Sequence, residues 1–267
     1  MLKDLSFLIK KLFFSEKYLL EKRIKRSLFN NLEPELKILK DLTDKSKASI
    51  DIGVFRGVYS YALSDHSTNV YGFEANPIMF KTLHKNLLLL KNNIKLFNVA
   101  LSSVEGEANL KIPLRNKSFI KKNFEDYYEG GLATIEDENT LDNNKYDVYL
   151  VKTRILDSFK FSEKIGFIKI DVEGHEFSVI KGGIELLKKD KPNLLIEIDK
   201  KHSHRVNETF KFLYGLGYSS FFFDDKNPDL DPLTIFLKPH YDIIKSLSSN
   251  YDNISMIGNF KIELRYD

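Results

Sequence analysis

The chain changes from one hydrophobic pattern to another at about residue 48. Before it, residues 2–29 carry apolar side chains every three or four positions, which predicts a long helix, and Glu35 to Leu42 are expected to form a second, short helix. After it, short apolar runs alternate with stretches of helical spacing. This alternation is typical of an α/β domain with a mostly parallel sheet. We therefore expect a helical extension over residues 1–47 and a single domain over residues 48–267.

The same pattern locates the elements of the domain. Its poorly patterned part lies in an inserted segment at about residues 107–147. There, a polar loop with Gly130 to Thr134 is expected to cover the substrate, with a disordered loop tip as the alternative. Strands are expected at Ala48 to Val54, Asn69 to Ala75, Ile94 to Leu101, Ala108 to Pro113, Val148 to Thr153, Ile165 to Val172, Asn193 to Ile198, Tyr218 to Phe223 and Ile254 to Ile262. Helices are expected at Val58 to Leu63, Pro77 to about Lys91, His175 to Lys189 and Glu208 to Leu216.

Composition and charge exclude several kinds of chemistry. The 267 residues include no cysteine, which excludes disulfides, thiolate zinc sites and a cysteine nucleophile. The net charge of +3 is too small to indicate nucleic-acid binding. The first apolar run, Leu5 to Ile9, is shorter than the ~7–15 residues of a secretory signal, and no run approaches the ~20 residues of a membrane span. We therefore expect a cytoplasmic protein.

The predicted first helix, residues 2–29, has one apolar and one basic face. One interpretation is that the apolar face packs on the core and the basic face is solvated. The other is that the helix docks on a membrane surface or a partner. The basic residues are Lys3, Lys10, Lys11, Lys17, Lys22, Arg23, Lys25 and Arg26.

A loop with two glycines follows the first predicted strand. Gly53 and Gly57 allow the backbone to turn sharply and to approach a ligand closely. Glu74, at the end of the second strand, can accept hydrogen bonds from both ribose hydroxyls of an adenosine. We therefore expect cofactor contacts from Asp51, Gly53, Gly57, Tyr59, Ser60, Glu74 and Ala75.

The spacing of these glycines separates two kinds of nucleotide ligand. A dinucleotide-binding loop reads Gly-x-Gly-x-x-Gly, whereas this loop reads Gly-x-x-x-Gly behind Asp51 and has no third glycine. Pyrophosphate tolerates no carboxylate beside it, but a ligand with an ammonium and a sulfonium group is attracted by one. Asp51 thus favours S-adenosylmethionine, with an unliganded or dinucleotide-binding Rossmann domain as the alternative. Asn98, at the end of the third strand, is placed either to reach the adenine edge or simply to end the strand.

A polar cluster follows the apolar strand at Ile165 to Val172. Lys169 and Asp171 share one face of this strand, and Asp171 falls at its carboxyl end, where ligands of parallel sheets bind. We expect the catalytic group to comprise Lys169, Asp171, Glu173 and His175, with Asp171 as the key polar residue and His175 or Glu173 as the base that takes a proton from a hydroxyl acceptor. The alternatives are helix capping by Glu173 and a structural role for His175.

Four stretches together resemble the FkbM-type methyltransferases. They are Asp51 to Ser60, Phe73 to Pro77, Val99 to Ser102 and Ile168 to Glu176, and the resemblance covers roughly Ser49 to Asp199. It implies a Rossmann-like class I fold with a mostly parallel seven-stranded sheet and S-adenosyl-L-methionine as cofactor, which leaves as S-adenosyl-L-homocysteine. It also implies methylation of a hydroxyl on a sugar, a glycan or another small metabolite. The chain departs from the family pattern at Val54, Phe55 and Ala75, where Ala, Asn and Pro are usual.

A bound metal is not predicted, and the expected partner is a small-molecule or glycan acceptor rather than nucleic acid. Asp171, Glu173, Glu197 and Asp199 offer the oxygen ligands that magnesium prefers, but their spacing defines no site. Two alternative functions stay open. One is a non-catalytic Rossmann-like module that docks through residues 2–29, and the other is a nucleic-acid methyltransferase.

Overall fold

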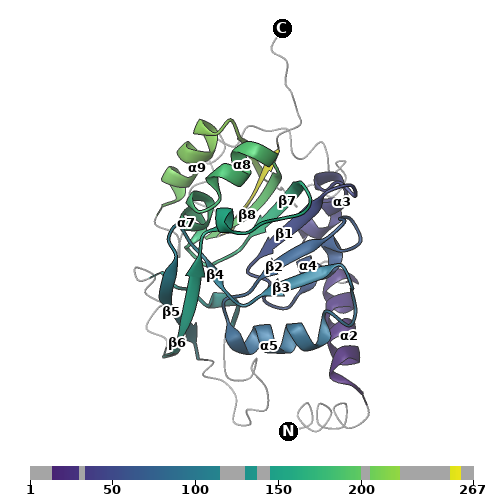
Figure 1. The fold of residues 1–267 in the computed structure, drawn as a ribbon. Coiled ribbons are helices and arrows are strands. Elements are labelled where there is room, and N and C mark those ends of the chain that lie inside the picture. Colours follow the sequence, from purple (N-terminus) through teal and green to yellow (C-terminus); the bar gives the residue numbers. More distant parts are fainter. Residues whose placement is uncertain are drawn as a thin grey trace.

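A seven-stranded sheet forms the centre of the molecule (Figure 1). The structure is a computed structural model, and it describes residues 14–29, 34–114, 130–136, 145–199, 205–222 and 253–259. The strand order is β3-β2-β1-β7-β8-β10-β9. Five strands are parallel: β3 (Ile94–Phe97), β2 (Val70–Phe73), β1 (Ala48–Ile52), β7 (Ile165–Ile170) and β8 (Asn193–Asp199). β10 (Asn253–Asn259) runs antiparallel to both β8 and β9 (Ser219–Phe222). The expected mostly parallel α/β sheet is therefore confirmed.

Helices cover both faces of this sheet and bury a separate apolar cluster on each (Figure 1). Phe167 of β7 belongs to one cluster and its neighbour Ile168 to the other. Central strands are thus apolar on both faces, which explains why the sequence marks them as continuous apolar runs. The first face carries α2 (Glu16–Phe29), the 3₁₀ turn η1 (Pro34–Ile38), α3 (Leu39–Leu42), α4 (Val58–Leu63) and α5 (Pro77–Asn86). The second face carries α7 (Glu176–Lys181), α8 (Ile184–Asp190) and α9 (Val206–Gly215).

Residues 94–101 form two strands in different sheets, so the single strand expected there is wrong. β3 ends at Phe97, where Asn98 donates from Nδ2 to the carbonyl oxygen of Glu74 at 2.7 Å. The chain then enters a second, three-stranded sheet of order β4-β6-β5, which the sequence did not indicate as a separate sheet. Its strands are β4 (Ala100–Leu101), β5 (Gly106–Pro113) and β6 (Tyr146–Arg154).

The helix expected from His175 to Lys189 is also wrong, because it is divided into α7 and α8 at Gly182 and Gly183. A Cβ atom on Gly182 would lie 2.0 Å from the carbonyl oxygen of Ser102. The Gly183 amide donates to the carbonyl oxygen of Ile180, and the carbonyl of Gly182 accepts from Asp157. The two glycines therefore let the turn between α7 and α8 pack directly on the residue that follows β4.

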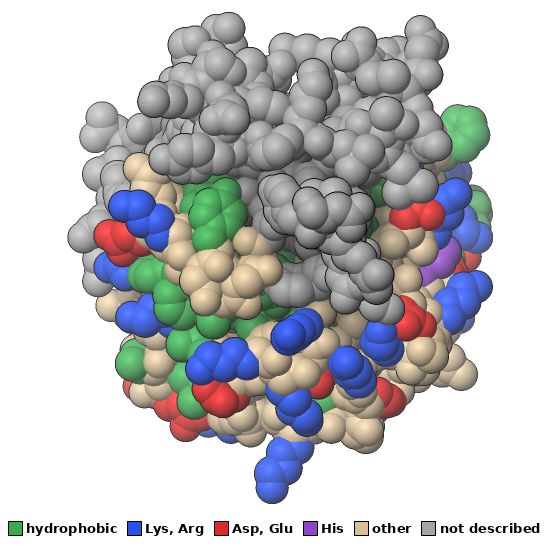
Figure 2. Space-filling model, turned by 90° about the horizontal axis from the view of Figure 1, so that it is seen from above, with side chains coloured by type: hydrophobic (Ala, Val, Ile, Leu, Met, Phe, Trp, Pro, Cys, Tyr) green, Lys and Arg blue, Asp and Glu red, His purple; other side chains and the backbone are tan. Residues whose placement is uncertain are grey.

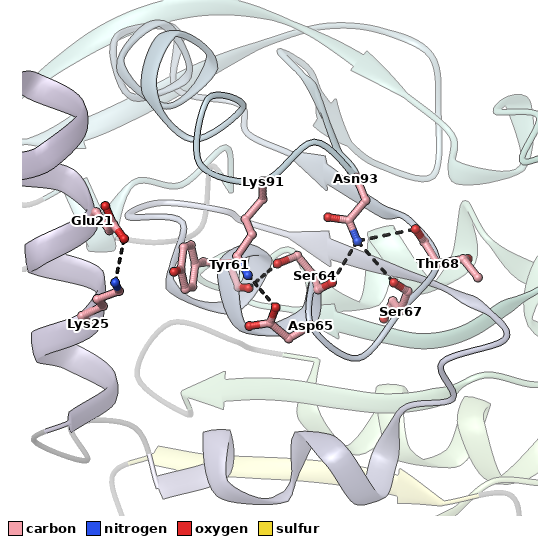
Figure 3. A network of polar contacts seen from close by, with 9 residues as sticks. All are labelled: Glu21, Lys25, Tyr61, Ser64, Asp65, Ser67, Thr68, Lys91 and Asn93. Atoms are coloured by element: carbon pink, nitrogen blue, oxygen red, sulfur yellow. Dashed lines mark hydrogen bonds and ion pairs between the residues drawn. The ribbon is translucent and has the colours of Figure 1, made fainter.

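Helix α2 is part of the core in the region that the structure describes. Leu20 and Ile24 are buried in the same cluster as α4 and α5. Figure 3 shows the polar surface beside it, where Lys91 pairs with Asp65 at 2.5 Å and lies over the ring of Tyr61. This agrees with the packing interpretation for residues 16–29. Residues 2–13 lie outside the described part of the chain, and docking through the basic face stays a prediction.

Ile24→Ala is expected to lower the free energy of unfolding by about 2–5 kcal/mol, because the Ile24 side chain is fully buried and its removal leaves a cavity. Phe29→Ala is the control, since Phe29 at the end of the same helix is 89% exposed and should change stability by less than about 0.5 kcal/mol. Urea unfolding measures both. Equal, small effects would show that α2 contributes little to the core.

Membrane insertion finds no support in the helices of the described segments. None of them combines the length and the apolar character that crossing a bilayer requires.

Candidate active site

A cleft lies at the carboxyl ends of β1, β2 and β7. In an open parallel sheet, ligands bind at this edge. The order of the sheet reverses between β1 and β7, since the chain builds β2 and β3 on one side of β1 and β7 and β8 on the other. Six of the predicted site residues line the cleft: Gly53, Glu74, Ala75, Asp171, Glu173 and His175.

The loop after β1 is held in place by backbone contacts that require glycine. Gly53 has φ +84°, and its amide donates to the carbonyl oxygen of Phe73 at 2.9 Å. A Cβ atom on Gly53 would lie 1.8 Å from the carbonyl oxygen of Asp171. Gly57, with φ +76°, packs on Leu87 of the first helical layer instead of lining the cleft. Gly53 thus brings the ends of β1 and β7 together, and Gly57 starts α4.

Glu74 is buried at the end of β2 and faces the cleft. Its Oε2 accepts from the amide of Phe55 at 2.7 Å, and its Oε1 accepts from the amide of Asn76 at 2.8 Å. Burial raises the pKa of Glu74 to about 7; the amides of Asn76 and Phe55 oppose the shift, while the carboxylates of Asp51 and Asp171 add to it. The carboxyl therefore ties the loop after β1 to β2. Each of its oxygens keeps a further lone pair with which to accept a hydroxyl.

The affinity for S-adenosylmethionine is expected to rise by up to about tenfold between pH 6 and pH 8. Glu74 is largely protonated at pH 6, and the carboxylate that forms above pH 7 accepts ribose hydroxyls better and attracts a cationic ligand. Titration calorimetry measures the dissociation constant and the proton released on binding. Glu74→Gln should flatten this dependence, whereas Glu107→Gln on β5 should keep it. If Glu74→Gln showed the same pH dependence of affinity as wild type, the titrating group would belong to the ligand and not to Glu74.

Four predicted residues form a buried polar layer between the sheet and α4, behind the cleft. Asp51 accepts from the hydroxyl of Ser60 at 2.5 Å. The ammonium of Lys169 lies 4.3 Å from the centre of the Tyr59 ring. Burial alone would lower the pKa of Lys169, but the carboxylates of Asp171 and Asp51 outweigh it and hold this pKa above its usual value. Asp51, Tyr59, Ser60 and Lys169 therefore support the site from behind and do not line the cleft.

Asp171 joins this buried layer to the cleft. Its Oδ2 accepts from Nζ of Lys169 at 2.7 Å, and its side chain is 28% exposed, against 4% for that of Lys169. Among the described residues, its other oxygen, Oδ1, has no hydrogen-bond partner. Asp171 is thus fixed through one oxygen and can accept a ligand hydrogen through the other.

Asn98 has a different place from the adenine contact considered for it. Its amide nitrogen donates to the carbonyl oxygens of Glu74 at 2.7 Å and Ala75 at 3.2 Å. Asn98 therefore fixes the backbone that carries two cleft residues, and it lies outside the lining of the cleft.

Residues 130–136, called here the roof segment, contribute to the cleft. Gly130, Gly131, Ala133 and Ile135 line it. The main chain of Thr134 pairs with that of Lys111 on β5.

The structure also reveals two residues that the sequence analysis did not select, Ser102 and Glu136, and a contact of Thr134. His175 contacts the carboxylate of Glu136 through Nδ1 and the hydroxyl of Ser102 through Nε2, the latter at 2.9 Å. The hydroxyl of Thr134 donates to the carbonyl oxygen of Glu173 at 2.8 Å. Ser102 belongs to a stretch that carried the family resemblance, and Thr134 ends the loop that was expected to cover the substrate. Glu136 lies in the poorly patterned segment and gave no signal.

Within the described residues, no group of three or more His, Asp and Glu side chains could hold a metal ion. The side chain of Asp199, one of the four oxygen ligands considered, lies outside the described part.

The residues of the cleft fit S-adenosylmethionine. The carboxylate of Glu74, at the end of β2, can accept hydrogen bonds from ribose hydroxyls. The negative charges of Asp51 and Asp171 attract a ligand with an ammonium and a sulfonium group. The close approach of β1 and β7 at Gly53 leaves backbone, without a side chain, at this edge. A Rossmann-like sheet with this set of acids is typical of the S-adenosylmethionine-dependent methyltransferases.

Comparison with known proteins gives the family. The model of the methyltransferase FkbM domain matches residues 51–220, and the chain therefore belongs to the FkbM family of S-adenosylmethionine-dependent methyltransferases. A comparison with curated proteins finds no significant match.

Several solved structures are similar to the chain at low sequence identity. Methyltransferase FkbM from Methylobacillus flagellatus KT is 16% identical with a TM-score of 0.47, and the match covers 81% of this chain but only 44% of that protein. An rRNA methylase from Streptococcus thermophilus is 11% identical, with coverage of 85% and 95% and a TM-score of 0.45. SMU.1697c from Streptococcus mutans, in complex with SAH, is 13% identical, with coverage of 86% and 97% and a TM-score of 0.43.

Proposed function

We propose that this protein transfers a methyl group from S-adenosylmethionine to a hydroxyl oxygen of a sugar, a glycan or another small hydroxylated metabolite. The observation that carries this proposal is the carboxylate of Asp171. One of its oxygens is fixed by Lys169, and the other lies at the cleft without a partner among the described residues. A carboxylate held in this way can orient a hydroxyl and accept its proton.

The cofactor supplies an electrophilic methyl group on its sulfonium. Glu74 accepts hydrogen bonds from the ribose hydroxyls, and the loop at Gly53 lets the backbone approach the ligand. Asp171, with Asp51 and Lys169 behind it, keeps the cleft negatively charged beside the positive sulfur. With both reactants bound, these residues would hold them at a near-attack distance of ~3–3.5 Å, which lowers the entropy cost of the reaction.

The acceptor hydroxyl is a weak nucleophile until its proton is taken. As the new O–C bond forms and the C–S bond breaks, the hydroxyl proton passes to the base. Asp171 is the residue that we assign to this contact. Glu173 and His175, which also line the cleft, are the other residues with suitable chemistry.

The charge distribution gives no support to a nucleic-acid acceptor. The net charge is +3, and in the described part of the face seen in Figure 2, Lys and Arg side chains are interspersed with Asp and Glu side chains. A basic strip with aromatic residues would be needed to hold a nucleic-acid strand.

The test uses the full chain, S-adenosylmethionine with a labelled methyl group, and extracts of glycans and small metabolites. Mass spectrometry should find the label as a methyl ether, and Glu74→Ala should weaken cofactor binding in calorimetry. Absence of cofactor binding would overturn the proposal. Label found on RNA, with steep dependence on salt, would replace the hydroxylated metabolite by a nucleic acid.

A further inference from the structure

His175 links the roof segment to the residue that follows β4. Its Nδ1 contacts the carboxylate of Glu136 in the roof segment, and its Nε2 lies 2.9 Å from the hydroxyl of Ser102. The His175 side chain is 12% exposed and that of Glu136 is 21% exposed, while Ser102 is buried. The contact is therefore largely screened from water, and it joins the roof segment to His175 and Ser102 of the main domain.

The hydrogen-bonding capacity of the ring is used up by these two contacts. A neutral imidazole has one N–H and one lone pair, and an ionised carboxylate can only accept. Nδ1 therefore carries the proton that it donates to Glu136, and Nε2 accepts the hydroxyl hydrogen of Ser102. No lone pair remains with which His175 could take a proton from an acceptor.

The roof segment has further attachments beside this one. The hydroxyl of Thr134 donates to the carbonyl oxygen of Glu173 at 2.8 Å and accepts from the amide of Glu136 at 3.0 Å. Thr134 is almost fully buried, and its main chain pairs with Lys111. His175 and Glu173 are neighbours on one turn, so the roof segment is fastened twice to the turn that follows Asp171.

We propose that His175 is a positioning residue that, held by Ser102 and Glu136, fixes the roof segment over the cleft, while Asp171 contacts the acceptor hydroxyl. The roof residues that line the cleft then set the shape of the acceptor side. Ser102 and Glu136 act through His175 and touch no substrate. The assignment of Asp171 rests on the proposed function, whereas the fastening of the roof segment does not.

The first experiment needs no acceptor. Hydrogen exchange of the full chain, followed by mass spectrometry, reports the opening of residues 130–136. His175→Ala and Glu136→Ala should speed this exchange at least about tenfold, whereas His175→Gln should stay within about threefold of wild type, because the amide of Gln offers one donor and one acceptor. His84→Ala, on the exposed side of α5, is the control and should change nothing. Unchanged exchange in His175→Ala would overturn the proposal.

The second experiment reads the state of the ring. In the ¹⁵N-histidine-labelled chain at pH 8, with His175→Gln to assign the signals, NMR should show His175 protonated at Nδ1. Ser102→Ala should shift the Nε2 signal and leave that of Nδ1. A proton on Nε2 at this pH would contradict the arrangement.

The third experiment separates positioning from proton transfer, with a pool of methyl hexosides as the hydroxyl probe. His175→Ala should raise the KM for the probe about tenfold or more and change kcat less, and His175→Gln should restore both and keep the pH profile. A general base at this position would instead cost about 10²–10⁴ in kcat for both variants. If the wild-type protein methylates no hexoside, the proposal that its acceptor is a sugar fails. The role of His175 is then decided by the hydrogen-exchange experiment alone.

Discussion

Asp171→Asn is expected to lower the rate of methyl transfer by about 10²–10⁴ while S-adenosylmethionine still binds. The asparagine amide keeps the size of the side chain but cannot take the proton of an acceptor hydroxyl, and general-base catalysis contributes a factor of this order. Lys169 stays compensated in the variant, because the carboxylates of Asp51 and Glu197 also act on it. Single-turnover kinetics with labelled cofactor measures the chemical step.

Asp65→Asn is the matched control for this substitution. Asp65 also pairs with a lysine, but on the surface beside α2 (Figure 3), and it does not line the cleft. Its loss should leave kcat unchanged and cost no more than about 1 kcal/mol of stability. If Asp171→Asn kept more than about a tenth of the wild-type rate with normal cofactor affinity, the proton acceptor would be a different residue.

Gly53→Ala is expected to lower the free energy of unfolding by about 3–6 kcal/mol and to abolish detectable cofactor binding. The new methyl group would overlap the carbonyl oxygen of Asp171, at 1.8 Å, in a backbone conformation with φ +84°. The cost combines about 1–2 kcal/mol for the left-handed conformation, 1–3 kcal/mol for overpacking and 0.5–1.5 kcal/mol for a lost backbone hydrogen bond. To remove this overlap, the ends of β1 and β7 would have to move apart, and this movement would change the geometry of the cleft. Urea unfolding and calorimetry measure the two effects.

Gly215→Ala provides the comparison for Gly53→Ala. Gly215 ends α9, has ordinary backbone angles, and a Cβ atom there would meet nothing within 4 Å. Alanine should therefore leave stability unchanged or raise it by up to about 1 kcal/mol. Similar losses in both variants would mean that the close approach of β1 and β7 is unimportant.

The sequence predicted the central sheet because its strands are buried on both faces. All five parallel strands were located within two residues at each end, apart from the run through Asn98. The errors in the bounds of strands and helices lie at positions where one specific contact overrides the hydrophobic pattern. At Asn98 a hydrogen bond from the side-chain amide to the carbonyl oxygen of Glu74 ends β3 within an apolar run. At Gly182 the approach of Ser102 ends a helix whose apolar spacing continues.

The residues of the candidate site were likewise predictable only in part. Gly53, Glu74 and Asp171, which line the cleft, could be selected from the sequence because a glycine or an acid directly after a predicted strand indicates a ligand site. Whether a residue lines the cleft or supports it from behind depends on how close it lies to the end of the strand: Asp171 reaches the cleft, whereas Lys169, two residues earlier on the same face, is buried behind it. Glu136 could not be found, because its role depends on a contact with His175 across 39 positions of the chain.

The position of β10 between β8 and β9 has a consequence for the order of folding. Among the described strands, β9 pairs with β10 alone, so residues 219–222 cannot join the sheet before residues 253–259 arrive. Until then β8 is an unpaired edge of a largely apolar parallel sheet, the kind of edge on which chains associate. During synthesis this edge is exposed from the time β8 docks until the last strand inserts, and aggregation in expression should be most sensitive to changes that slow this step.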